Sequence, residues 1–170
     1  KFLAVNLPGL TGQVVNIVSK VDSLTANSRD GGVNITLNGT TSLQGLTGRG
    51  DSSLVNYVGD IALGSINLNG YSLDIDNQGG SILSGIIRDT INVTLKAAGS
   101  IGNDSAIQTY AYGGGTTTVT LTAVAANGAD GSIALQEQYG LNATNVTADG
   151  NVENRLFTPP MGLTPSAMQA

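Results

Sequence analysis

Two short groups of residues in this 170-residue chain have types and spacing that could support binding chemistry. The first is Arg49, Gly50 and Asp51, an Arg-Gly-Asp tripeptide of the kind that binds integrin receptors when an exposed loop displays it. Gly48 before it and two serines after it favour such a loop. The alternative is an ordinary turn between two strands, where Gly and Asp are common for conformational reasons.

Asp74 and Asp76 form the second group, because a spacing of two puts both carboxylates on one face of a strand. Carboxylate oxygens are the ligands that Ca²⁺ prefers, so this pair is a candidate calcium site. The Gly-Gly-x-Gly-x-Asp repeat of calcium-binding solenoids is absent, and Leu73 and Ile75 facing inward would leave the two carboxylates on a solvated face. We therefore predict no metal and no cofactor, with Ca²⁺ as the alternative.

Catalytic chemistry has few candidate residues in this sequence. His and Cys are both absent, which excludes Ser-His pairs, His-metal sites and thiolate chemistry. Basic residues are scattered along the chain and form no cluster. We predict that the protein is not an enzyme; the alternative is a carbohydrate-active β-helix enzyme that uses Asp74 and Asp76 as paired carboxylates.

Composition narrows the class of partner. Charged residues make up only 11% of the chain and the formal net charge is −5, which disfavours nucleic acid and anionic membranes as partners. No apolar run reaches the ~20 residues that span a bilayer. Aromatic residues are only 4%, so the core must be thin and built from aliphatic side chains, which suits stacked sheets.

Short segments of alternating apolar and polar residues recur from residue 33 onward, and Gly, Asn and Asp separate them. The apolar residues that close the recurring segments are Leu37, Leu63, Leu95, Leu121 and Ala148, with 26 to 32 residues between them. Gly-Ser-Ile also occurs four times, at 64–66, 80–82, 99–101 and 131–133. This repetition predicts an all-β fold, a right-handed parallel β-helix of about five coils of ~27 residues, with Leu95, Leu121 and Ala148 stacked. The alternative is a β-sandwich.

The two ends of the chain depart from this pattern. Residues 1–28 read as an N-terminal cap or a subunit-pairing segment, 29–153 as the β-solenoid, and 154–170 as a C-terminal tail that its prolines keep from continuing a ladder. Unpaired strands at solenoid ends are templates for association. Six residues in these segments are candidates for assembly contacts: Phe2, Val5, Leu7, Phe157, Pro159 and Pro160.

The stretches AAGSIGNDSAIQT (97–109), LTAVAANGADGSIALQE (121–137) and GLNATNVTADGNV (140–152) together resemble the repeat region of large bacterial exoproteins of the filamentous-haemagglutinin type. The resemblance implies a right-handed parallel β-helix and a secreted or cell-surface location. It implies a non-enzymatic adhesin-like or structural segment, with a self-assembling filament subunit as a more specific version. The expected partners are other copies, neighbouring domains of the same protein, or surface glycans and receptors.

Rows of Thr and Asn, at 116–122 and 142–147, are a further feature of the outward-facing positions. Flat ladders of these residues bind ice or carbohydrate in other solenoids. The first coils lack regular Thr spacing, which disfavours ice binding. The simpler interpretation is that Thr favours strands and keeps the surface soluble.

Overall fold

Alternating apolar and polar residues produce short parallel strands that stack into a β-solenoid. The computed structural model describes residues 1–7, 14–124, 131–138 and 141–156, and within them all strand pairings are parallel. In chain order the elements are β1 (Phe2–Leu7), β2 (Val14–Ser19), β3 (Ser23–Ser28), β4 (Gly32–Leu37), β5 (Thr41–Thr47), β6 (Ser52–Asn56), β7 (Ile61–Asn77), β8 (Gly85–Ala97), β9 (Ile107–Ala111), the 3₁₀ turn η1 (Tyr112–Gly114), β10 (Thr117–Ala123), β11 (Ile133–Gln138), β12 (Leu141–Ala148) and β13 (Val152–Leu156).

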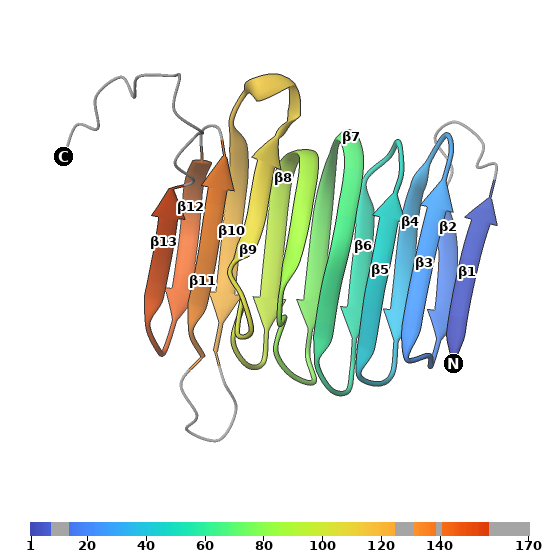
Figure 1. The fold of residues 1–170 in the computed structure, drawn as a ribbon, viewed down its shortest axis with the longest axis horizontal. Helices are drawn as coiled ribbons and strands as arrows, with labels where there is room; N and C mark the ends of the chain where they lie inside the picture. Colours follow the sequence, from blue (N-terminus) through green and yellow to red (C-terminus); the bar gives the residue numbers. More distant parts are fainter. Residues whose placement is uncertain (8–13, 125–130, 139–140, 157–170) are drawn as a thin grey trace.

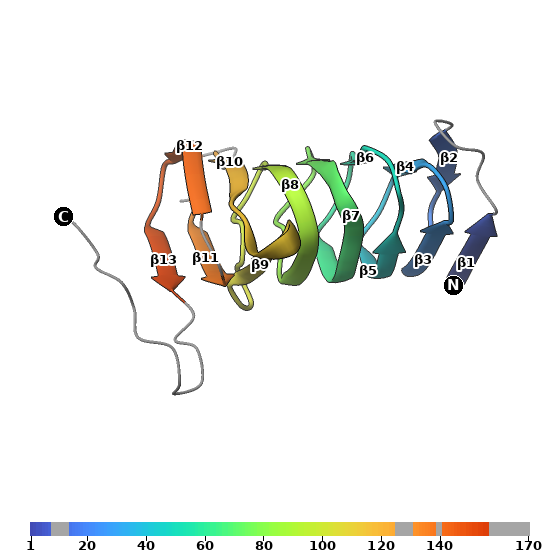
Figure 2. The ribbon, with the colours of Figure 1, turned by 90° about the horizontal axis from the view of Figure 1, so that it is seen from above.

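Each coil contributes one strand to each of two faces (Figure 1). The first face runs through β1, β3, β5, the start of β7, the start of β8, β9, β11 and β13. The second face runs through β2, β4, β6, the end of β7, the end of β8, β10 and β12. The view from above shows the two faces opposite each other and the coils winding in the right-handed sense (Figure 2), the usual sense of parallel β connections. The predicted parallel solenoid is confirmed, and the sandwich alternative is not observed.

The coil is shorter than the repeat that the sequence suggested. Ile61, Ile82 and Ile101 bridge one another in successive coils at separations of 21 and 19 residues, and the solenoid has about six turns. The predicted stack is partly right: Leu121 lies in register with Leu95, but Val146 rather than Ala148 follows Leu121. Ala148 pairs with Ala123 instead. The repeat estimate was too long because the chosen residues alternate between faces, and Leu63 belongs to the first face.

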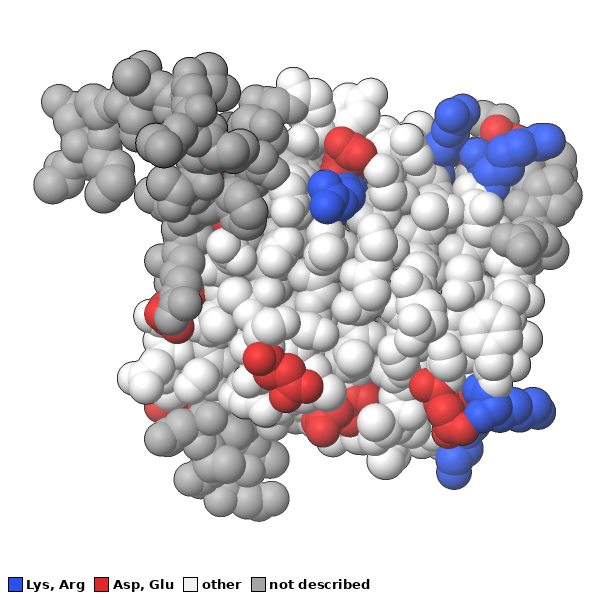
Figure 3. All heavy atoms as spheres, viewed as in Figure 1, with Lys and Arg blue, Asp and Glu red and all other residues white. Residues whose placement is uncertain are grey.

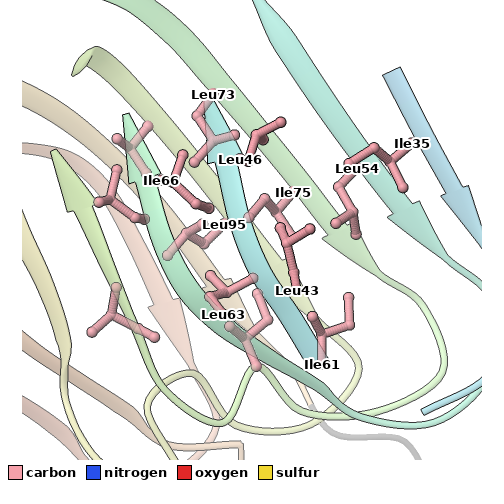
Figure 4. Close-up of a cluster of buried hydrophobic side chains, with 14 of the residues drawn as sticks. Ile35, Leu43, Leu46, Leu54, Ile61, Leu63, Ile66, Leu73, Ile75 and Leu95 are labelled. Carbon is pink, nitrogen blue, oxygen red and sulfur yellow. The ribbon is translucent and has the colours of Figure 1, made fainter. Parts of the chain in front are cut away.

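Inward-facing side chains form columns that run along the rod (Figure 4). The main column of the second face is Ile35, Leu54, Ile75, Leu95 and Leu121, each in register with the next and none more than 2% exposed. Side chains of the first face pack against this column from the other side of the interior. Full burial of each such aliphatic side chain stabilises the fold by about 1.5–3 kcal/mol, so the core consists of many small, equivalent contributions.

Serine hydroxyls link successive coils at the corner that leads back to the first face. The backbone N–H of Ser81 donates to Asp60 Oδ1 at 2.7 Å, that of Ser100 to Ser81 Oγ at 3.0 Å, and that of Ser132 to Ser100 Oγ at 3.0 Å. Asn151 N–H then donates to Ser132 Oγ at 3.2 Å. This serine ladder explains three of the four Gly-Ser-Ile repeats; the fourth, at 64–66, lies in β7 on the first face.

Two asparagines are fully buried at the end of the second face. Asn56 Nδ2 lies 2.9–3.0 Å from three oxygens, the carbonyls of Val58 and Gly59 and Oδ1 of Asn77. Asn56 Oδ1 in turn accepts the Gly39 N–H at 3.3 Å. Asn77 repeats the arrangement one coil later by donating to the Ser81 carbonyl at 2.9 Å. Buried amides of this kind satisfy turn backbone groups that solvent does not reach.

The terminal segments join the same ladders. β1 pairs with β3 and β2 pairs with β4, so the regular pairing begins at Phe2 and not at residue 29. β13 extends the first face to Leu156, beyond the boundary at 153 that the sequence suggested. Residues 157–170 lie outside the described residues. Within the described ranges no helix is long and apolar enough to cross a bilayer.

Candidate functional site

A polar groove of about 260 Å³ lies on the outside of the second face, across β4, β6, β7 and β8. Outward-facing side chains form its floor in two rows along the rod. Asn34, Ser53, Asp74 and Thr94 are in register across the four strands and make one row. The residues that line the groove are Asn34, Asp51, Ser52, Ser53, Ser72, Leu73, Asp74, Asn92 and Thr94.

Hydrogen bonds between coils fix several of these side chains. Ser53 Oγ donates to Asn34 Oδ1 at 2.8 Å, and Asn92 Nδ2 donates to Ser72 Oγ at 3.2 Å. Asp51 Oδ1 accepts the backbone N–H of Ser72 at 2.9 Å. The rim and the floor of the groove are therefore held in place before any ligand arrives.

The groove brings together residues from both groups that the sequence singled out. Asp51 belongs to the Arg-Gly-Asp turn and Asp74 to β7, and both line the groove. Asp76 lies on the same outward side of β7 but outside the groove, where its Oδ2 accepts from Gln78 Nε2 at 2.9 Å. The expectation that Leu73 and Ile75 face inward is confirmed, since they are 1% and 0% exposed.

The Arg-Gly-Asp turn connects β5 to β6 and stacks on the turn of the preceding coil. Arg49 N–H donates to the Gly31 carbonyl at 3.0 Å, and a Cβ on Gly50 would lie 2.4 Å from the backbone nitrogen of Gly32. Glycine is thus required here by close coil packing. Arg49 is exposed, while the Asp51 carboxylate is directed back to the neighbouring coil.

A metal centre finds little support among the described residues. They contain no group of three or more His, Cys, Asp or Glu side chains arranged to hold a metal ion. The pair Asp74 and Asp76 therefore stands without the third carboxylate that a calcium site of this kind would use.

One buried carboxylate was not singled out from the sequence. Glu137 on β11 faces the interior and is 6% exposed, and desolvation by burial raises the pKa of its carboxyl. Its register partner on β9 is Thr109, whose buried hydroxyl has no hydrogen-bond partner. The alternation of β11 could have indicated this inward position, because Ile133 and Leu135 have the same parity.

The candidate assembly residues have different surroundings. Phe2 is 64% exposed on the outer side of β1, whereas Val5 packs partly against the core. Leu7 ends β1, in register with Ser28. Phe157, Pro159 and Pro160 lie outside the described residues.

Comparison with protein-family models, with curated proteins and with solved structures found no match. The resemblance to filamentous-haemagglutinin-type repeats therefore stays a prediction. The β-solenoid fold by itself favours neither an adhesive nor an enzymatic role. On present evidence, this chain is defined by its fold, a two-faced parallel β-solenoid with a polar groove on its second face.

Proposed function

We propose that this chain is a non-enzymatic structural rod, an adhesive or fibre-building segment of a secreted or cell-surface bacterial protein, whose copies associate end to end. The bacterial surface location is supported only by the resemblance of its repeats. End-to-end association is supported by the distribution of charge, which is the observation that carries the proposal.

Charge is divided along the rod. Residues 1–50 hold four basic and two acidic side chains, a net charge of +2, whereas residues 51–170 hold three basic and ten acidic ones, a net charge of −7. Together these give the overall −5. Figure 3 shows most Lys and Arg atoms of the visible face at the end next to β1. The β1 end of one copy is thus electrostatically complementary to the β13 end of another.

Apolar side chains at the two ends are less covered than those inside. Leu3 and Val5 on β1 are only partly buried, although their register partners Leu24 and Ala26 are almost inaccessible. At the other end Val152 is 55% exposed, whereas its partner Ile133 is 1% exposed. Parallel strand edges of this kind are templates for pairing with another strand. A β13-to-β1 contact would be head-to-tail and would repeat without closing, which builds a filament.

Sedimentation velocity and electron microscopy of the 170-residue chain test this proposal. We expect concentration-dependent, open-ended oligomers at low ionic strength that shorten as salt screens the end charges. Lys20→Glu, near the β1 end, should weaken association, because it removes positive charge there.

Lys96→Glu is the matched control, because Lys96 is also exposed and the change in net charge is identical, but it lies in the middle of the rod on β8. Monodisperse monomers at every salt and protein concentration would exclude end-to-end association. Equal weakening by the two substitutions would show that net charge, and not the β1 end, controls assembly.

A further inference from the structure

The polar groove on the second face has the length of a chain-binding site. Its floor crosses four stacked strands, from Asn34 on β4 to Thr94 on β8. Stacked strands are about 4.8 Å apart, so the groove extends for roughly 14 Å along the rod. A linear ligand lying along the rod axis would pass over equivalent polar groups at each coil.

The groups in the groove can both donate and accept hydrogen bonds. Serine and threonine hydroxyls and asparagine amides do both, and the two carboxylates accept strongly. Asp74 is exposed and makes no hydrogen bond within the described part of the chain, and Asp51 uses only Oδ1 on Ser72. Both carboxylates therefore retain acceptor capacity that faces the groove.

Charge and composition exclude several classes of ligand. No Lys or Arg lines the groove, so uronate, sulfate or phosphate groups would meet two carboxylates without a compensating cation. The only apolar lining residue, Leu73, is buried, which disfavours an apolar ligand. Neighbouring hydroxyls on an uncharged sugar, in contrast, can donate to a carboxylate in short charge-assisted hydrogen bonds.

We propose that this groove binds an uncharged, linear oligosaccharide along the rod axis, with Asp51 and Asp74 accepting hydrogen bonds from sugar hydroxyls. Asn34, Ser53 and Asn92 supply the accompanying neutral hydrogen bonds. The side chains already held between coils lose little freedom on binding, which favours affinity. This inference is independent of end-to-end association, because the groove lies on the side of the rod.

Isothermal titration calorimetry with defined hexasaccharides tests the proposal. The probes are cellohexaose, mannohexaose, xylohexaose and N-acetylchitohexaose, with hexagalacturonate as the acidic comparison. High salt keeps the copies apart, so failure to bind sugar is distinguishable from failure to assemble. We expect at least one neutral hexasaccharide to bind and hexagalacturonate not to bind.

Asp74→Ala should weaken that binding at least tenfold, because it removes the exposed carboxylate from the floor. Asp76→Ala is the matched control: it removes a carboxylate from the same strand and the same outward side, but outside the groove. We expect it to change the affinity less than twofold. Both variants should melt like the parent protein, since neither side chain is in the core.

Three results would overturn the proposal. No heat or spectral change with any neutral hexasaccharide at millimolar concentration would mean that the groove is not a site for uncharged sugar chains. Equal loss in Asp74→Ala and Asp76→Ala would place binding elsewhere on the second face. Tighter binding of hexagalacturonate than of every neutral probe would contradict the role of the two carboxylates.

Discussion

Replacing Asn56 with alanine should destabilise the solenoid strongly, although the substitution removes no apolar surface. The Asn56 side chain is fully buried and its amide serves the turn after β6. Asn56→Ala removes two N–H donors that three oxygens share, and it removes the acceptor of the Gly39 N–H. The turn would then have to find other partners or leave these groups unpaired.

The magnitude follows from the hydrogen bonds that are lost. Each contributes about 1 kcal/mol net, and a group left buried and unpaired costs about 1–3 kcal/mol. Val58 is 55% exposed, so water can replace part of the loss at its carbonyl. We therefore expect a decrease of about 2–4 kcal/mol in the free energy of unfolding, or roughly 5–15 °C in Tm for a chain of this size.

Urea and thermal unfolding followed by circular dichroism measure this loss. Asn16→Ala is the control, because Asn16 is an exposed asparagine on β2 whose side chain accepts one surface hydrogen bond. Surface substitutions of that kind change stability by about 0.5 kcal/mol or less. A loss in Asn56→Ala no larger than that in Asn16→Ala would refute the role assigned to the buried amide.

Asn56→Asp separates hydrogen bonding from shape. The carboxylate matches the amide in size but faces the carbonyl oxygens of Val58 and Gly59 without a donor. Burial among acceptors should raise the pKa of the introduced carboxyl above its unfolded-state value. The variant should then be most stable below the unfolded-state pKa and lose stability as pH rises through the folded-state pKa. Stability that rises with pH relative to the parent protein would contradict this account.

Two further substitutions test the interior and the coil packing. Glu137→Gln should raise Tm at pH 7 and change it little at about pH 3.5, because burial raises the pKa of the Glu137 carboxyl, so the parent protein loses stability as pH rises through that folded-state pKa; an equal or lower Tm of the variant at pH 7 would contradict this. Gly50→Ala should lower Tm by several degrees, since its Cβ would lie 2.4 Å from the Gly32 nitrogen, whereas Gly45→Ala, with no neighbour closer than 3.8 Å, should change Tm little; similar melting of the two variants would mean that the Arg-Gly-Asp turn can shift to admit a side chain.

Local alternation predicted the strands because it is a property of neighbouring residues. Val33 to Leu37 and Thr117 to Leu121 both read correctly as strands, and the outward position of Asp74 followed from Leu73 and Ile75. The coil length did not follow in the same way. Both faces have the same inward pattern of Leu, Ile and Val, so the sequence does not reveal which copies belong to one face.

The groove depends on register, which local patterns do not contain. Asp51 and Asp74 are 23 residues apart and become neighbours only because Ser52 pairs with Leu73. A 20-residue period in the polar positions would have been the signal, but the long coil from Ile107 to Leu135 obscures it. Glu137 was missed because a charged residue among polar neighbours reads as exposed unless the parity of its strand is followed inward.

The serine ladder and the strand pairings share a direction that has a mechanical consequence. Their hydrogen bonds run between coils, parallel to the rod axis, and each coil contacts chiefly its two neighbours. Tension applied to the ends would therefore load one coil boundary at a time instead of shearing all of them together. Each coil that peels away would release about 20 residues, or roughly 70 Å of extended chain. A rod built this way lengthens stepwise under load and absorbs work, while the coils that remain stacked keep their structure.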